Sequence, residues 1–343
     1  MNRILRSPRR AAVVTAAAFI AAALTTGVAV ADPGPAADTH SSDTVGYGPE
    51  LTDEAAAFVY GLANPDAAPQ GSNNWDCKPD AAHPRPVVLV HGTWASAFGA
   101  YSYMSPELAK AGYCVFTFNY GRANVPGAGL VQPTIGATGD IDESAGQLAA
   151  FVDRVLAATG ASQVDTIGHS QGGVVIREYL KFHGGADAGD PSRNKVNHVI
   201  TYGATNHGTT LSGLGSLLGP LGGALGVDLT NPTADLIGQA GVEQLIGSPL
   251  LTRLNADGDT MPGIDYTIVA DQYDEVSSPY SRTYLDAGPG ATVNDVLLQD
   301  GCGQDTSDHN SMVYSPRGLS IALNALDPVA HPTLTCSANP WLL

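Results

Sequence analysis

The sequence predicts an α/β fold in which helices flank a mostly parallel central sheet. Short apolar, β-branched runs alternate with amphipathic helical stretches from about residue 75 onward, a pattern typical of a parallel sheet with crossover helices. Several predicted strands are apolar throughout, as expected for strands that helices cover on both faces. A G-x-S-x-G motif also lies between one such strand and the helix after it.

Each apolar run of four to seven residues is interpreted as one strand. The predicted strands are residues 87–90, 114–120, 164–167, 196–202, 266–270 and 292–298. Between them the periodicity predicts helices at residues 106–111, 142–159, 173–182 and 317–326. In the helix at 142–159, Leu148, Val152, Val155 and Leu156 recur at helical spacing.

Residues 1–31 are expected to be a signal peptide. Four arginines precede an uncharged apolar run at 11–30, and an Ala-Val-Ala sequence at 29–31 forms a small-x-small cleavage site. The run is also just long enough to span a membrane as an uncleaved anchor. Its many alanines make it weakly hydrophobic, and the cleavage site favours removal. We therefore expect a secreted, extracellular protein with no stable membrane insertion after signal removal.

Two regions of the mature chain depart from the alternation. Residues 32–72 are rich in Ala, Pro, Asp and Ser, with one short helical patch at 54–60, and are predicted to form a flexible N-terminal arm or a strap over the domain. Residues 73–343 form the predicted α/β domain. Within it, residues 208–262 contain an excess of Leu and Gly. This insertion is interpreted either as a movable cap or as an excursion packed permanently on the core.

The charge balance excludes several kinds of partner. The net charge is −17, and it becomes −21 without residues 1–31, which hold four arginines and no acid. A polyanion of this size repels phosphate backbones and anionic headgroups, so nucleic acid is not an expected partner. Any contact with lipid is expected to be apolar.

The four cysteines are expected to form two disulfides. An even count in an exported protein allows three connectivities, of which we favour Cys77–Cys114 and Cys302–Cys336 because each pair is consecutive in the sequence. No Cys or His cluster has the spacing of a zinc site. No metal site and no cofactor are predicted.

Ser170 is the predicted nucleophile, because it is the central residue of the G-x-S-x-G motif at 168–172. A strand–turn–helix context is what a nucleophile elbow requires, and the flanking glycines leave room for the tight turn. A tetrahedral oxyanion needs two backbone donors. The expected donors are the amides of Gln171, directly after the nucleophile, and Thr93, on the loop after the first strand.

His309 is the favoured base among nine histidines, because it lies after the last predicted strand and just before the last helix. The expected chain order of serine, acid and histidine argues against His91. His207 follows a strand and is the main rival. The acid is expected on the loop after residues 266–270, where Asp271 and Asp274 both qualify and Asp274 is preferred for its D-x-V-x-x-P continuation, with Glu275 a poor third.

The motifs in this order resemble those of the alpha/beta-hydrolase fold and, within it, secreted actinobacterial triacylglycerol lipases. The resemblance runs from about residue 73 to the C-terminus. The segments that carry it are AHPRPVVLVHGTW at 82–94, GHSQGG at 168–173, YDEV at 273–276 and DH at 308–309. It implies Ser170, Asp274 and His309 as a catalytic triad, with Thr93 and Gln171 as oxyanion donors.

The sequence thus predicts a secreted serine ester hydrolase, and more narrowly a lipase that cleaves acylglycerol esters through an acyl-enzyme on Ser170. Its partner would be an ester or lipid substrate, with an oil–water interface as one setting. One alternative is a soluble carboxylesterase or polyester hydrolase. Another, of a different kind, is an acyltransferase that passes the acyl group to an alcohol other than water.

Overall fold

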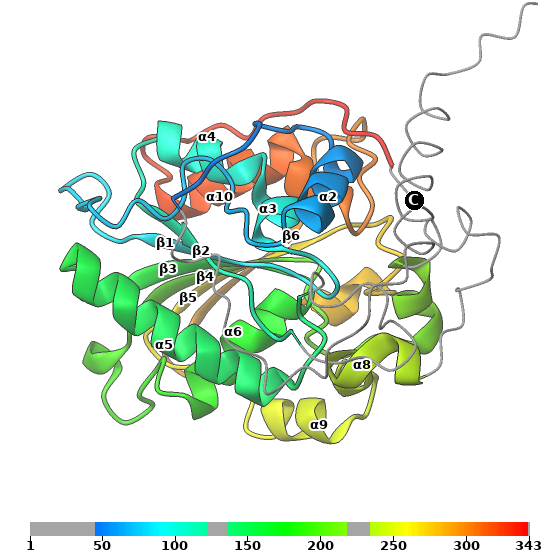
Figure 1. Cartoon of the computed structure of the whole chain (residues 1–343). Helices are drawn as coiled ribbons and strands as arrows, with labels where there is room; N and C mark the ends of the chain where they lie inside the picture. Colours follow the sequence, from blue (N-terminus) through cyan, green and yellow to red (C-terminus); the bar gives the residue numbers. More distant parts are fainter. Residues whose placement is uncertain (1–44, 123–135, 218–233, 342–343) are drawn as a thin grey trace, which may run out of the picture.

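The computed structural model describes residues 45–122, 136–217 and 234–341, with a six-stranded sheet at its centre (Figure 1). Its strands are β1 (Val87–Val90), β2 (Val115–Thr117), β3 (Val164–His169), β4 (Val196–Tyr202), β5 (Asp265–Ala270) and β6 (Thr292–Leu297). All neighbouring pairs are parallel, in the order β2-β1-β3-β4-β5-β6. The predicted α/β fold class is confirmed. The order reverses between β1 and β3, and such a switch point is where parallel sheets bind ligands.

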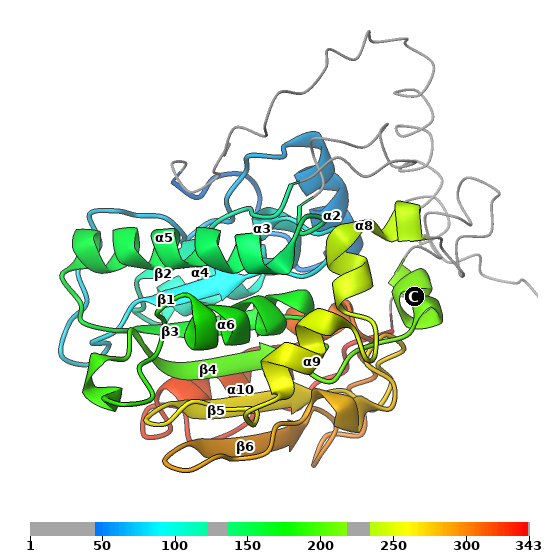
Figure 2. The same ribbon diagram turned by 90° about the horizontal axis from the view of Figure 1, so that it is seen from below.

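Helices cover both faces of the sheet (Figures 1 and 2). One face carries α5 (Ile141–Thr159), α6 (Gln171–Phe182), α8 (Ala234–Glu243) and α9 (Pro249–Asn255), and the other carries α2 (Glu54–Ala63), α3 (Ala97–Tyr101), α4 (Met104–Lys110) and α10 (Pro316–Leu326). The described residues also contain the 3₁₀ helices η2 (Pro191–Arg193), η3 (Tyr280–Thr283) and η4 (Ser311–Tyr314), and residues 211–217 are helical. Successive side chains of β1 pack into opposite layers, as the strand period of two requires.

The predicted strands are found, but the second is shorter than the apolar run suggests. The run at 114–120 is buried, yet β2 covers only Val115–Thr117. The side chain of Asn119 accepts a hydrogen bond from the Ala97 amide at 2.7 Å and donates one to the Pro65 carbonyl at 2.9 Å. These bonds hold the end of the apolar run against neighbouring loops, so residues 118–120 do not continue β2.

The segment before β1 lies across the domain. Residues 1–44, which include the predicted signal peptide and the first part of the predicted arm, lie outside the described residues. From residue 45 the chain leads into α2, which packs on α3, where the Tyr60 and Phe98 rings are 4.4 Å apart. Asn73 then makes two hydrogen bonds to the outer edge of β2. Its amide donates to the Val115 carbonyl, and its side-chain oxygen accepts from the Thr117 amide. This contact covers the edge strand.

The Leu/Gly-rich insertion at 208–262 divides into differently packed parts. Residues 218–233 lie outside the described residues. Leu250, Leu251 and Leu254 of α9 are buried in the same core as α6. Leu214 and Ile237 instead form a small separate cluster with Trp94, on the loop after β1. Within the residues that the structure describes, no helix has the length and apolarity needed to cross a membrane.

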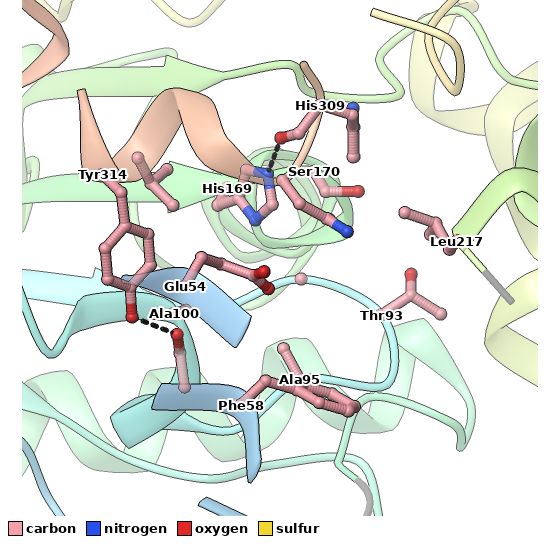
Figure 3. Close-up of a pocket in the computed structure, with 14 residues that line it drawn as sticks. Glu54, Phe58, Thr93, Ala95, Ala100, His169, Ser170, Leu217, His309 and Tyr314 are labelled. Atoms are coloured by element: carbon pink, nitrogen blue, oxygen red, sulfur yellow. Dashed lines mark hydrogen bonds between the residues drawn. The ribbon is translucent and has the colours of Figure 1, made fainter. Parts of the chain in front are cut away.

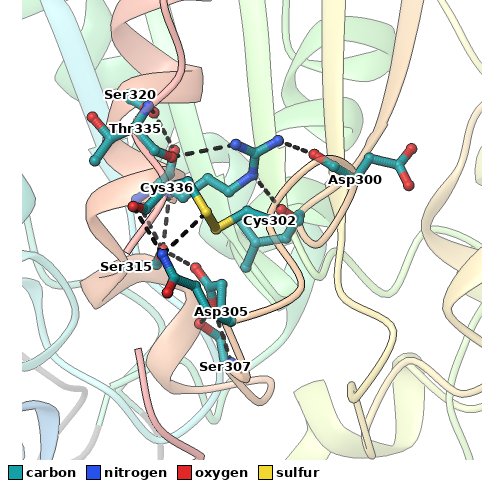
Figure 4. Close-up of a disulfide and its surroundings, with 12 residues drawn as sticks. Asp300, Cys302, Asp305, Ser307, Ser315, Ser320, Thr335 and Cys336 are labelled. Atoms are coloured by element: carbon teal, nitrogen blue, oxygen red, sulfur yellow. Dashed lines mark hydrogen bonds between the residues drawn. A yellow bond between two sulfur atoms is a disulfide. The ribbon is translucent and has the colours of Figure 1, made fainter. Parts of the chain in front are cut away.

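Two disulfides join distant parts of the chain, and both predicted pairs are found. Cys77–Cys114 links the segment before β1 to the start of β2, and Cys302–Cys336 links the loop after β6 to the C-terminal tail. Figure 4 shows the second bridge in a dense set of hydrogen bonds. Asp305 accepts from the Ser315 hydroxyl at 2.5 Å, and the Arg317 guanidinium donates to the carbonyls of Leu298, Asp300 and Thr335. The loop that leads to His309 is therefore held at several points.

Candidate active site

Ser170 lies on a sharp turn between the end of β3 and the first residue of α6. Its φ is 53° and its ψ is −123°, a strained conformation for a residue with a side chain, costing on the order of 1–3 kcal/mol. A Cβ on Gly172 would lie 2.1 Å from the Val90 carbonyl oxygen, and one on Gly92 would lie 2.9 Å from the Ser170 Cβ. These two glycines let β1 approach the turn closely, as a nucleophile elbow requires.

The structure brings His309 and Asp274 together. His309 Nδ1 lies 2.9 Å from Asp274 Oδ2, and both side chains are fully buried. His309 Nε2 is also buried, with no hydrogen-bond partner among the described residues, and His309 lines the same pocket as Ser170. Burial lowers the pKa of His309, but the nearby carboxylates of Asp274, Glu275 and Asp308 raise it by more, so its pKa is above the ordinary value. An imidazole nitrogen without a hydrogen-bond partner, in a pocket that a serine also lines, is chemically able to accept a proton.

The two candidate acids have different surroundings. Asp274 Oδ1 accepts hydrogen bonds from the amides of Val276 at 2.8 Å and Ser277 at 2.6 Å, which leaves Oδ2 for the imidazole. Asp271 instead accepts from the Tyr273 amide and the Gln299 side chain, and burial raises its pKa to about 7. Asp271 therefore holds its own turn, and of the three candidate acids only Asp274 bonds to the His309 ring. Glu275, the third candidate, contacts only the His309 amide, at 3.4 Å.

Gln171 and Thr93, the predicted oxyanion donors, meet beside Ser170. Gln171 begins α6, and the first amides of a helix have no acceptor within it. The Thr93 hydroxyl accepts hydrogen bonds from the Gln171 amide side chain at 3.0 Å and from that of Gln244 at 2.9 Å. These bonds tie the loop after β1 to the start of α6 and to the residue after α8 in the insertion.

The rival histidines have other roles in the structure. His207 bonds to Asp259 and to the Arg282 carbonyl, away from the pocket. His91 is buried and donates from Nδ1 to the Gly92 carbonyl, and burial lowers its pKa to about 4. His169 is 2.8 Å through Nε2 from the His309 carbonyl, and burial, with His309 as a second cause, lowers its pKa to about 3. A neutral His169 donates this bond and holds the His309 backbone beside the serine.

Gly203 is a residue of the site that the sequence analysis missed. It follows the last residue of β4 and has a φ of +54°. A Cβ at this position would lie 2.9 Å from Asp274 Oδ2 and 3.0 Å from His309 Nδ1. Its carbonyl also accepts a hydrogen bond from the Ser277 hydroxyl at 2.9 Å. The absence of a side chain at Gly203 therefore makes room for the Asp274–His309 pair. The sequence signal for this role was a glycine directly after a predicted strand.

Ser170 and His309 line a pocket whose other walls come from several parts of the chain (Figure 3). Phe58, Ala95, Ala100, Leu217 and Val313 contribute apolar side chains. The sequence analysis missed the contribution of α2, from which Glu54 and Phe58 reach the pocket. The helical patch at 54–60 was recognised, but nothing in its local pattern indicates which surface the helix covers.

A candidate metal-binding group lies elsewhere, on α5 and α6 and the residue after α6. Asp142, Glu178 and His183 place one potential ligand atom each within 4.8 Å of the others. The Arg253 guanidinium donates to both carboxylates, and the His183 ring bonds to Asp142 at 3.1 Å. Arginine thus already supplies the positive charge that these acids require. The prediction that the protein needs no metal stays a prediction.

The chain is similar to known lipases in sequence and in fold. A family model described as Lipase (class 2) matches residues 84–297. A triacylglycerol lipase of Pseudarthrobacter phenanthrenivorans is 27% identical over 249 residues, covering 70% of this chain and 66% of that protein. A triacylglycerol lipase of Burkholderia plantarii has the same identity, with 59% of its length covered. This chain therefore spans less than two thirds of either relative. Aspergillus fumigatus lipase B shares the fold, with a TM-score of 0.54 at 19% identity over 76% of this chain and 55% of that one.

Proposed function

This chain belongs to the class 2 lipase family, and we propose that it is a secreted serine ester hydrolase that cleaves acylglycerol esters. One observation carries the proposal. A strained serine at a strand–helix turn shares a pocket with a buried imidazole whose second nitrogen contacts a carboxylate at 2.9 Å. This is the arrangement of nucleophile, base and orienting acid that acyl transfer uses.

In the proposed mechanism the Ser170 hydroxyl attacks the ester carbonyl while His309 Nε2 takes its proton. Asp274 holds the Nδ1–H of the imidazole and stabilises the positive charge that forms on the ring. The amides of Thr93 and Gln171 donate to the oxyanion. His309 then gives the proton to the leaving alcohol, and an acyl-enzyme remains on Ser170. Water activated by His309 releases the acid and restores the serine.

The substrate class is argued from the pocket and from the relatives. The apolar side chains of Phe58, Leu217 and Val313 line the space beside Ser170, which suits an acyl chain better than a charged group. Both curated relatives are described as triacylglycerol lipases. Hydrolysis rates on tributyrin above and below its solubility limit separate a lipase from a soluble esterase, because only a lipase is expected to gain activity when an interface forms.

Ser170→Ala is the direct test of the mechanism. We expect kcat for a p-nitrophenyl ester to fall at least about 10³-fold without loss of folding. Ser281→Ala, which removes an exposed serine hydroxyl, is the control and should retain wild-type activity. Near-wild-type activity in Ser170→Ala would eliminate the assignment of the nucleophile.

The proposal that the protein is secreted rests on the predicted signal peptide at residues 1–31. The two disulfides of the fold are compatible with an oxidising compartment. Expression of the full chain in a secreting host, followed by N-terminal sequencing of the protein in the medium, is expected to give a mature chain that begins at Asp32. Recovery only from the membrane fraction, with the leader intact, would instead support the uncleaved anchor.

A further inference from the structure

A carboxyl group lies in the pocket beside Ser170 and is not used by the proposed mechanism. Glu54 and Phe58 lie one turn apart on α2, and both line the pocket. Figure 3 shows the Glu54 carboxyl pointing into the pocket, below His169 and Ser170. A lipase pocket that receives an apolar acyl chain has no evident need for an acid, so this side chain calls for an explanation.

The position of Glu54 is fixed by packing of α2 on the domain. The Tyr60 ring lies 4.4 Å from that of Phe98 on α3. A Cβ on Gly61 would lie 2.6 Å from the Ser96 hydroxyl oxygen, so the helix approaches α3 closely. The side chain of Asp53 caps the helix by accepting from the Ala56 amide at 2.9 Å. The carboxyl of Glu54 is therefore carried into the pocket by a held helix.

Glu54 is part-buried, and its carboxyl has no hydrogen bond or ion pair with any residue in the described part of the chain. The groups that face it do not compensate its charge. Asp53 is on its own helix, and Asp308 and Tyr314 come from the loop and 3₁₀ helix around His309. The remaining titratable groups of the pocket are His169, which is neutral, and His309, which Asp274 already pairs.

We propose that Glu54 is a charge-selecting residue of this pocket, which lowers the pocket's affinity for carboxylates beside Ser170 and so favours neutral esters over the fatty-acid anion released from them. The inference rests on the proposed ester hydrolase function. A neutral ester meets an uncompensated carboxyl with little electrostatic penalty. A fatty-acid anion in the same place meets a like charge in a partly desolvated space, where repulsion is strong.

The strength of this selection depends on pH. Burial raises the pKa of Glu54 to about 8, with the negative charges of Asp308 and Asp53 adding to the effect. Below this pH the side chain is mostly neutral, and above it the side chain is charged. Discrimination against carboxylates is therefore weak at pH 6 and strong at pH 9.5, even though a fatty acid is ionised at both pH values.

Inhibition by a matched pair of ligands tests the proposal. Hexanoate and hexanamide are nearly equal in size, and only hexanoate is charged. Their inhibition constants against hydrolysis of a p-nitrophenyl hexanoate ester give a ratio for each variant. At pH 9.5 we expect Glu54→Gln to reduce the hexanoate-to-hexanamide ratio about tenfold relative to wild type. At pH 6 the two proteins should differ less than about twofold.

Asp53→Asn is the control, since it removes the same charge one residue away, and asparagine retains the cap. It should leave the ratio as in wild type. Glu54→Lys should lower the ratio further than Glu54→Gln. An unchanged ratio in Glu54→Gln at pH 9.5, or an equal shift in Asp53→Asn, overturns the proposal. Loss of Ser170-dependent ester hydrolysis in wild type would instead overturn the proposed function, so the two failures are distinct.

Discussion

The two halves of the pocket are built in different ways. One half is the end of the sheet, where Ser170, Gly203 and the Asp274–His309 pair are buried and held by backbone hydrogen bonds and close glycine contacts. The other half is a cover made of α2 and residues 211–217, which contributes Glu54, Phe58 and Leu217, all part-buried. The comparison supports the proposal that the bond-making groups belong to the buried core and that groups added around it select the ligand.

The largest loss of kcat in this comparison is expected from removing the charge of Asp274 at the end of the sheet. Asp274→Asn should lower kcat about 10³-fold, because the amide cannot stabilise the protonated imidazole. Asp271→Asn, only three residues away, should lower kcat less than about tenfold, because Asp271 bonds to its own turn and to Gln299. Steady-state kinetics on one ester compare the two variants. A larger loss for Asp271→Asn would reverse the assignment of the acid.

A smaller but still large loss is expected from adding a single methyl group at the sheet end. Gly203→Ala should lower kcat about 10²-fold, because the new Cβ would displace the Asp274 carboxylate or the His309 ring. Gly160→Ala is the matched control. Gly160 also has a positive φ, of 78°, but nothing lies within 4 Å of its Cβ position.

Both glycine variants should lose about 1–2 kcal/mol of stability from the left-handed backbone, and thermal unfolding measures this cost. Only Gly203→Ala should also lose activity. Equal kinetics in the two variants would show that Gly203 serves the turn alone and not the Asp274–His309 pair.

The same division explains what the sequence could predict. Most residues found at the sheet end had been singled out from local patterns: the strand–turn–helix motif gave Ser170 and Gln171, and the loop after the first strand gave Thr93. Chain order then pointed to His309 and to the loop after residues 266–270, where the D-x-V-x-x-P continuation favoured Asp274 over Asp271. The cover was not predicted. The helical patch of α2 was visible, but its docking over the pocket depends on packing against α3, and Tyr60 and Phe98 are 38 residues apart. Gly203 was missed for a similar reason, because its role depends on side chains from two distant loops.

The smallest expected effect concerns the stability of the cover. The pKa of Glu54 is raised from an ordinary value of 4.5 to about 8, so between these pH values the folded protein binds more protons at this site than the unfolded chain. Folding stability contributed by this residue therefore falls as pH rises from about 4.5 to 8, and the penalty is complete above pH 8. Glu54→Gln removes the penalty.

At pH 9 we accordingly expect Glu54→Gln to melt about 2–4 °C above wild type, equivalent to about 1 kcal/mol, whereas at pH 4 the two should melt together. Asp53→Asn, at the exposed helix cap, is the control and should show no such pH-dependent gain. If Glu54→Gln raised the melting temperature equally at pH 4 and pH 9, the Glu54 side chain would destabilise the fold through its packing and not through its charge. The cover would then select ligands by packing alone, and the electrostatic difference between the two halves of the pocket would disappear.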